Sequence, residues 1–137
     1  MKITLKRIES PFVLQAENEQ GNQILIDASP DIGGTNKGPR PMELLLMGLG
    51  GCTSIDVLMI LQKQKLIVVD YSVEVVGERE QVDQVKLFKD IHLTFHIKGP
   101  FEVQNAKRAI DLSLEKYCSV AKTLEKTAKI TYTLLEV

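Results

Sequence analysis

The sequence predicts an α+β domain in which antiparallel sheets pack around one long central helix. Short runs near both ends of the chain alternate apolar and polar residues at period two, as half-buried strands do. Between them lies a long and nearly continuous apolar segment at residues 44–61, which indicates a helix. The order of strands, long helix, strands, helices and strand differs from the strict alternation of a doubly wound parallel sheet.

Three short strands are expected before the long helix, because apolar residues occupy alternate positions there. The positions concerned are Ile3 and Leu5, then Phe12, Leu14 and Ala16, then Ile24 and Ile26. Turns before Pro11 and around Gly21 would fold them into an antiparallel meander. The following segment, residues 27–41, is rich in glycine and proline and predicts a long loop.

The long helix is predicted to run from Pro41 to about Lys65. Proline suits the first helical turn, and Glu43 there complements the helix dipole. The apolar segment is almost long enough to span a bilayer, but Asp56 near its centre makes that placement costly. We therefore expect a central helix covered nearly all round by protein, and an obligate homodimer if one protomer cannot cover it.

The second half of the chain predicts a strand at residues 69–75, a charged connection at 77–84 and a strand at 87–97. A helix is expected at residues 103–117 from its apolar spacing. Cys118 and Ser119 then open a short second helix, and a strand at residues 130–134 closes the chain.

Size and charge limit the functions that the chain can have. Its 137 residues fit a single domain over residues 1–137, and 17 Lys and Arg nearly balance 18 Asp and Glu. That balance gives no basic field for nucleic-acid binding. The N-terminal segment lacks the apolar stretch of a secretory signal, so we expect a cytoplasmic protein with reduced thiols and no membrane partner.

Two cysteines, Cys52 and Cys118, are the main candidates for chemistry. Cys52 follows Gly50 and Gly51, whose lack of side chains leaves room for a substrate or another backbone. Cys118 opens a helix, where free N–H groups and the helix dipole favour a thiolate and are expected to lower its pKa. The plainer alternative is that both are small core residues.

The other residues that could form a functional site are weaker candidates than the two cysteines. His92 and His96 lie four apart on a predicted strand, which separates them by about 13 Å and disfavours a shared metal ion. The loop sequence GGTNKG lacks the spacing of a phosphate-binding loop and is interpreted as structural or substrate-shaping. Asp56 lies one helical turn after Cys52, so it either touches the surroundings of the sulfur or pairs with a distant Lys or Arg.

Three segments together resemble the OsmC/Ohr family. They are Gly-Gly-Thr-Asn at residues 33–36, the run from Pro-Met-Glu-Leu to Gly-Gly-Cys at 41–52, and Tyr-Cys-Ser-Val-Ala at 117–121. The pattern is closer to the OsmC-like branch than to typical organic hydroperoxide resistance proteins. The resemblance implies an OsmC-like fold and an intertwined homodimer with active sites at the subunit interface.

The resemblance also implies a thiol-dependent peroxidase that reduces organic hydroperoxides, with hydrogen peroxide as a second candidate substrate. Cys52 would be the peroxidatic nucleophile, and Cys118 would resolve its sulfenic acid to a disulfide. A disulfide between Cys52 and Cys118 requires their Cα atoms to lie roughly 4.4 to 6.8 Å apart. A dithiol or a lipoylated protein would reduce the disulfide, so no tightly bound cofactor and no metal are expected.

The family further uses an Arg and a Glu around the reactive sulfur, and here the pattern departs. Met42 occupies the usual Glu position and Glu43 follows it, while Arg40 is the nearest candidate Arg. Glu43 and Arg40 are therefore assigned as the polar support. The departure leaves two alternatives open: a catalytically weak redox-sensing or ligand-binding module, and a role for Cys118 in packing alone.

Overall fold

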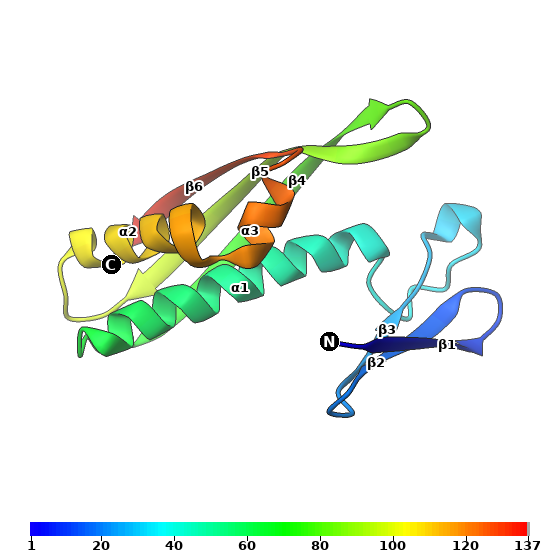
Figure 1. Cartoon of the computed structure of the whole chain (residues 1–137), viewed down its shortest axis with the longest axis horizontal. Coiled ribbons are helices and arrows are strands. Elements are labelled where there is room, and N and C mark those ends of the chain that lie inside the picture. The colour runs from blue at the N-terminus through cyan, green and yellow to red at the C-terminus, as the bar shows by residue number, and fades with distance from the viewer. Residues whose placement is uncertain (137) are drawn as a thin grey trace. The chain divides into compact units, whose positions relative to one another are not determined.

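The computed structural model describes residues 1–136, and its contacts divide the chain into two compact units (Figure 1). The first unit comprises Met1–Leu45 and the second begins at Leu46. The sequence-based expectation of one domain over the whole chain stays a prediction.

The first unit contains a three-stranded meander with the strand order β1-β2-β3. Its strands are β1 (Ile3–Glu9), β2 (Val13–Asn18) and β3 (Gln23–Ile26), and both pairs are antiparallel, as predicted. In the single chain β1 is exposed along its whole length, so the prediction of a half-buried strand is wrong for β1. The buried apolar residues of the meander lie on the other two strands: Val13, Ala16 and Ile26.

The loop after β3 is organised around the buried carboxylate of Asp27. This carboxylate accepts hydrogen bonds from the backbone N–H groups of Ala28, Thr35 and Lys37 at 2.7, 3.0 and 3.2 Å, and from the Thr35 hydroxyl at 3.0 Å. Burial acts to raise the pKa of Asp27, but these hydrogen bonds outweigh it and hold the pKa below its ordinary value. The N–H groups of the GGTNKG loop thus bind a carboxylate of the chain itself, which supports the structural interpretation.

Gly34 permits this loop to close. A Cβ atom at Gly34 would lie 1.8 Å from the carbonyl oxygen of Ala28, a distance that no side chain tolerates. The loop also contains a short 3₁₀ helix, η1 (Pro30–Ile32).

The long helix α1 (Pro41–Lys63) begins at the predicted proline and ends two residues before the predicted Lys65. Lys65 adopts a positive φ of 61°, the left-handed conformation that commonly follows a helix. Its backbone N–H donates to the carbonyl of Gln62 at 2.9 Å, and the N–H of Leu66 donates to that of Leu61 at 3.0 Å. These bonds satisfy carbonyl groups that the helix end leaves free.

The single chain does not cover α1 all round, so that expectation is wrong for the protomer alone. By length and composition α1 could cross a membrane, and only 28% of its most apolar window is buried. One face is fully buried: Leu49, Thr53, Val57 and Leu61. The opposite face exposes an apolar stripe, which we call the α1 outer face: Met47, Gly51, Ile55 and Met59.

The second unit contains a three-stranded sheet with the order β4-β5-β6. Its strands are β4 (Asp70–Val82), β5 (Val85–Lys98) and β6 (Lys129–Glu136). The predicted connection at residues 77–84 is wrong, because both strands continue to a tight turn at Asp83 and Gln84. Asp83 takes a φ of 53°, which aspartate tolerates better than most residues.

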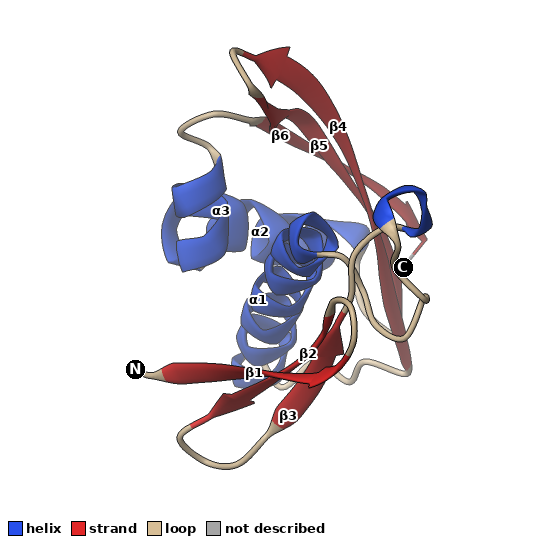
Figure 2. Ribbon diagram, turned by 90° about the vertical axis from the view of Figure 1, so that its right-hand side faces the viewer, coloured by secondary structure: helices blue, strands red, loops and turns tan. Residues whose placement is uncertain are grey.

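The pair β5–β6 is parallel, whereas antiparallel sheets were predicted. A parallel pair needs a long crossover, and the helical segment between the two strands supplies it. Figure 2 shows helices α1, α2 and α3 gathered on one side of this sheet. Of the alternating β5 side chains predicted to face the core, Ile91, Leu93, Phe95 and Ile97 are fully buried. The prediction is wrong for Leu87, which is half-buried, because the register shift opposite Glu78 and Arg79 turns Phe88 inward instead.

Contacts between α1 and β4 are close. A Cβ atom at Gly50 would lie 3.1 Å from a Val75 methyl group, so the absence of a side chain lets the helix approach the strand. The Tyr71 hydroxyl donates to Ser54 Oγ at 3.0 Å, which joins β4 to α1 a turn further along. These contacts fix the α1 segment that carries Cys52.

The helix predicted at residues 103–117 is interrupted. It forms α2 (Val103–Leu112) and then widens into a π-helical turn, η2 (Ser113–Tyr117), before the short helix α3 (Ser119–Leu124). The Cys118 N–H donates to the Ser113 carbonyl at 2.8 Å, which closes this wide turn. The prediction that a short helix opens at Cys118 and Ser119 is confirmed, with Cys118 as its N-cap.

Candidate active site

The structure brings the two cysteines of the chain together within the second unit. Cys52 lies on α1 and Cys118 precedes α3, yet their sulfur atoms lie within 4.8 Å of each other. Both thiols are free. A disulfide needs an S–S distance of about 2.05 Å, so the sulfurs must still approach each other before they can bond. The predicted distance between the Cα atoms of Cys52 and Cys118 stays a prediction.

Cys52 is partly exposed, and the two glycines before it have different surroundings. Gly50 faces β4, where Val75 leaves little space. Gly51 lies on the α1 outer face, and a Cβ atom built there would meet nothing within 4 Å. The single chain therefore leaves open space at Gly51, the residue before Cys52.

Cys118 is fully buried, and its sulfur accepts a hydrogen bond from the Ala121 N–H at 3.3 Å. Burial, with a smaller contribution from the neighbouring Cys52, raises the pKa of the Cys118 thiol to about 12. The backbone N–H groups of Ala121 and Val120 oppose this effect without overcoming it. The predicted lowering of this pKa is therefore wrong, because desolvation outweighs the N-terminus of a helix of only six residues.

Asp56 completes the site. A carboxylate oxygen of Asp56 lies within 4.8 Å of both sulfur atoms, and the Ser113 hydroxyl donates to Asp56 Oδ2 at 2.9 Å. Of the two roles left open by the sequence, the structure thus selects the one beside the sulfur. Ser113 was missed because the π-helical turn that brings it to Asp56 leaves no clear signal in the sequence.

The three residues are poorly suited to a structural metal site. A closed zinc site takes four ligands, and the group formed by Cys52, Asp56 and Cys118 offers three among the described residues. The histidines belong elsewhere: His92 interacts with the hydroxyls of Thr131 and Thr133 on β6, at 2.7 and 2.9 Å. The arrangement favours thiol chemistry, and the expected absence of a metal stays a prediction.

Arg40 and Glu43 form a pair within the first unit. The Arg40 backbone N–H donates to Glu43 Oε2 at 3.1 Å, as in a capping box, and its Nη1 donates to Oε1 at 2.9 Å. These two bonds hold the pKa of Glu43 below its ordinary value. The pair therefore caps α1, and its support of the Cys52 sulfur stays a prediction.

Comparisons with known proteins agree on one family. The family model described as OsmC-like protein matches residues 34–133. Protein YhfA of Escherichia coli strain K12 is 42% identical over 134 residues, which cover 96% of this chain and 95% of that protein.

Solved structures of similar fold extend the comparison. An OsmC-like protein from Mycoplasma pneumoniae has a TM-score of 0.83 at 25% identity, over 99% of this chain and 96% of that one. An organic hydroperoxide resistance protein from Legionella pneumophila has a TM-score of 0.73 at 16% identity, over 97% of this chain and 94% of that one. The latter likeness shows the fold alone.

Proposed function

Because the chain belongs to the OsmC-like protein family, we propose that it is a thiol-dependent peroxidase that reduces organic hydroperoxides. The observation that carries the proposal is the pair of free thiols, one partly exposed and one buried, with sulfurs within 4.8 Å. The Legionella protein of the same fold, named for organic hydroperoxide resistance, supports this substrate class.

Cys52 is the peroxidatic nucleophile in this proposal, because it is the sulfur that solvent and substrate can reach. Its thiolate attacks the terminal oxygen of ROOH, an S–O bond forms and the O–O bond breaks. The alkoxide takes up a proton and leaves as ROH, and Cys52 becomes a sulfenic acid. The apolar composition of the α1 segment around Cys52 favours an organic peroxide over hydrogen peroxide.

Cys118 is the resolving thiol. It condenses with the Cys52 sulfenic acid to give a disulfide and water, and a dithiol or a lipoylated protein then reduces that disulfide. These steps use thiols alone, so this chain needs no tightly bound cofactor of its own. The cytoplasm, which we propose as the location, keeps such dithiols reduced.

A homodimer is part of the proposal. The α1 outer face leaves Met47 at 56% and Ile55 at 67% exposure in the single chain, and a second copy that buries these side chains would gain hydrophobic stabilisation. The pair of Arg40 and Glu43 would then support the Cys52 thiolate. Sedimentation of a folded 15.3 kDa monomer at micromolar concentration would contradict the dimer.

The alternative is a catalytically weak redox-sensing or ligand-binding module, and Met42 at the usual Glu position favours it. Turnover separates the two functions. An enzyme consumes many equivalents of peroxide when a dithiol is present, whereas a sensor forms its disulfide once and is reduced slowly.

The experiment is steady-state consumption of cumene hydroperoxide by the pure protein with dihydrolipoamide as reductant. Wild-type protein should turn over, and Cys52→Ser should lose this activity while keeping the fold. Protein whose thiols are blocked with iodoacetamide serves as the background control. Undiminished consumption by Cys52→Ser would refute the assignment of the nucleophile.

A further inference from the structure

The position of the Asp56 carboxylate indicates that it takes part in the chemistry of the two thiols. Its carboxylate lies within 4.8 Å of both sulfurs, and one of its oxygens is held by the Ser113 hydroxyl at 2.9 Å. Ser113 is itself fully buried, and the same residue accepts the Cys118 N–H through its backbone carbonyl at 2.8 Å. One residue of the π-helical turn thus fixes the carboxylate and the buried thiol relative to each other.

The resolving step presents a chemical difficulty at Cys118. A thiol attacks a sulfenic acid effectively only as it loses its proton, and complete burial of Cys118 favours the protonated form. Water has poor access to a side chain with no exposed surface. The proton therefore needs an acceptor inside the site.

We propose that Asp56 is the general base of the resolving step and that Ser113 is the positioning residue that orients its carboxylate. This role rests on the proposed peroxidase function, because it acts on the sulfenic acid which that function forms. Among the described residues Asp56 makes no ion pair with Lys or Arg, and Cys52, Cys118 and Ser113 are the groups that the structure places around it. Its second oxygen is therefore available to the thiols.

Asp56 takes the proton of the Cys118 thiol while the Cys118 sulfur attacks the sulfur of the Cys52 sulfenic acid. An S–S bond forms, the S–O bond breaks and the leaving hydroxide receives the proton from Asp56 as water. Cys118 is oxidised from thiol to disulfide sulfur, Cys52 is reduced from sulfenic to disulfide sulfur, and the carboxylate is regenerated.

The test is a single-turnover experiment with Asp56→Asn, which keeps the size of the side chain and removes its basicity. Protein is mixed with one equivalent of cumene hydroperoxide and quenched at intervals. Mass spectrometry then separates the dimedone-trapped Cys52 sulfenic acid from the disulfide. In Asp56→Asn the disulfide should form about 10²-fold to 10⁴-fold more slowly than in wild-type protein, so the Cys52 sulfenic acid should accumulate.

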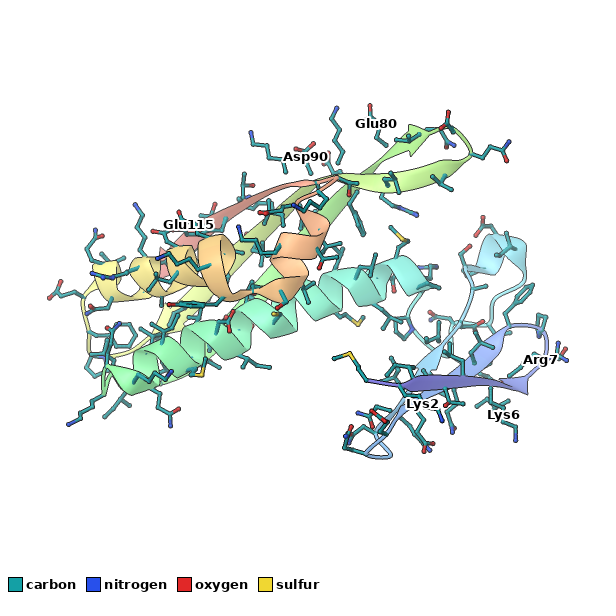
Figure 3. The ribbon with its side chains drawn as sticks, viewed as in Figure 1. Lys2, Lys6, Arg7, Glu80, Asp90 and Glu115 are labelled. Atoms are coloured by element: carbon teal, nitrogen blue, oxygen red, sulfur yellow. The ribbon has the colours of Figure 1, made fainter. Side chains whose placement is uncertain are left out.

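Asp90→Asn is the matched control. Asp90 is exposed on β5 and points away from the helices (Figure 3), so the same chemical change there should leave both steps unaltered. Ser113→Ala should slow the disulfide step less than Asp56→Asn, because the base remains and only its orientation is lost.

The pH dependence distinguishes a base from a residue that only shapes the site. In Asp56→Asn hydroxide must remove the proton, so the disulfide step should accelerate about tenfold per pH unit, while the wild-type rate should change little. If Asp56→Asn does not fold, the pH dependence of disulfide formation in wild-type protein is itself the test. A tenfold rise in that rate per pH unit would overturn the role of Asp56 as general base.

The outcomes also separate this role from the proposed function. Equal disulfide rates in Asp56→Asn and wild-type protein, with sulfenic acid formed in both, would refute the role of Asp56 and leave the peroxidase intact. Wild-type protein that forms neither sulfenic acid nor disulfide, with the peroxide unconsumed, would refute the peroxidase itself.

Discussion

Replacement of Cys118 by Ser and by Ala should separate its structural role from its chemical one. The Cys118 sulfur caps α3 by accepting the Ala121 N–H at 3.3 Å. A serine oxygen is a strong N-cap acceptor, so Cys118→Ser should retain the cap. Alanine offers no acceptor and leaves that N–H buried and unpaired.

The expected loss of stability in Cys118→Ala follows from the loss of the N-cap hydrogen bond. Loss of a helix N-cap to alanine costs about 1 kcal/mol, within a range of about 0.5 to 2. For a chain of this size about 1 kcal/mol lowers the melting temperature by about 4 °C. Thermal unfolding under reducing conditions should thus place Cys118→Ala about 4 °C below Cys118→Ser.

Peroxide consumption should respond differently. Both variants lack the resolving thiol, so both should stop after about one turnover, and Cys52 should advance to sulfinic acid when peroxide is in excess. Mass spectrometry detects that product as a gain of two oxygen atoms on Cys52. Multiple turnovers by Cys118→Ser at the wild-type rate would refute the resolving role and leave Cys118 a packing residue.

Two further predictions concern the first unit. Asp27→Asn should lower the melting temperature at pH 7, because the amide nitrogen cannot accept the N–H groups that now bind Asp27 Oδ2. Because the pKa of Asp27 is held below its unfolded value, its stabilisation is complete above about pH 5 and is lost as the pH falls through the folded pKa. The difference in melting temperature between the two proteins should therefore narrow as the pH falls below the unfolded pKa of about 3.8, and a difference that stays constant below that pH would contradict this reasoning. Arg40→Ala should slow peroxide consumption at least about tenfold if its guanidinium supports the Cys52 thiolate. Arg7→Ala, on the exposed β1 (Figure 3), is the control, and equal rates would rule out Arg40 as that support.

The sequence predicted the elements whose signals are local. Pro41 and the apolar run after it placed the start of α1 at the right residue, and alternation identified the buried face of β5. The turn at Asp83 was missed because charged residues in the preceding segment were interpreted as a loop, although long exposed strands can carry them. Parallel pairing of β6 was missed because alternation does not report the direction of a strand.

At the site, the sequence identified residue types better than their environments. Cys52 and Cys118 were singled out correctly as the residues that meet, and the helical spacing of Asp56 left its role open. The pKa of Cys118 was predicted in the wrong direction, since burial depends on distant contacts that the helix-cap pattern does not contain. Ser113 was missed for a related reason, because a π-helical turn changes which residues share a face.

The most direct test of the account is mass spectrometry of the wild-type protein after one equivalent of cumene hydroperoxide. A disulfide between Cys52 and Cys118 should form within the dead time of manual mixing, and dihydrolipoamide should return both thiols. Protein in which both cysteines remain reduced, with the peroxide unconsumed, would contradict it.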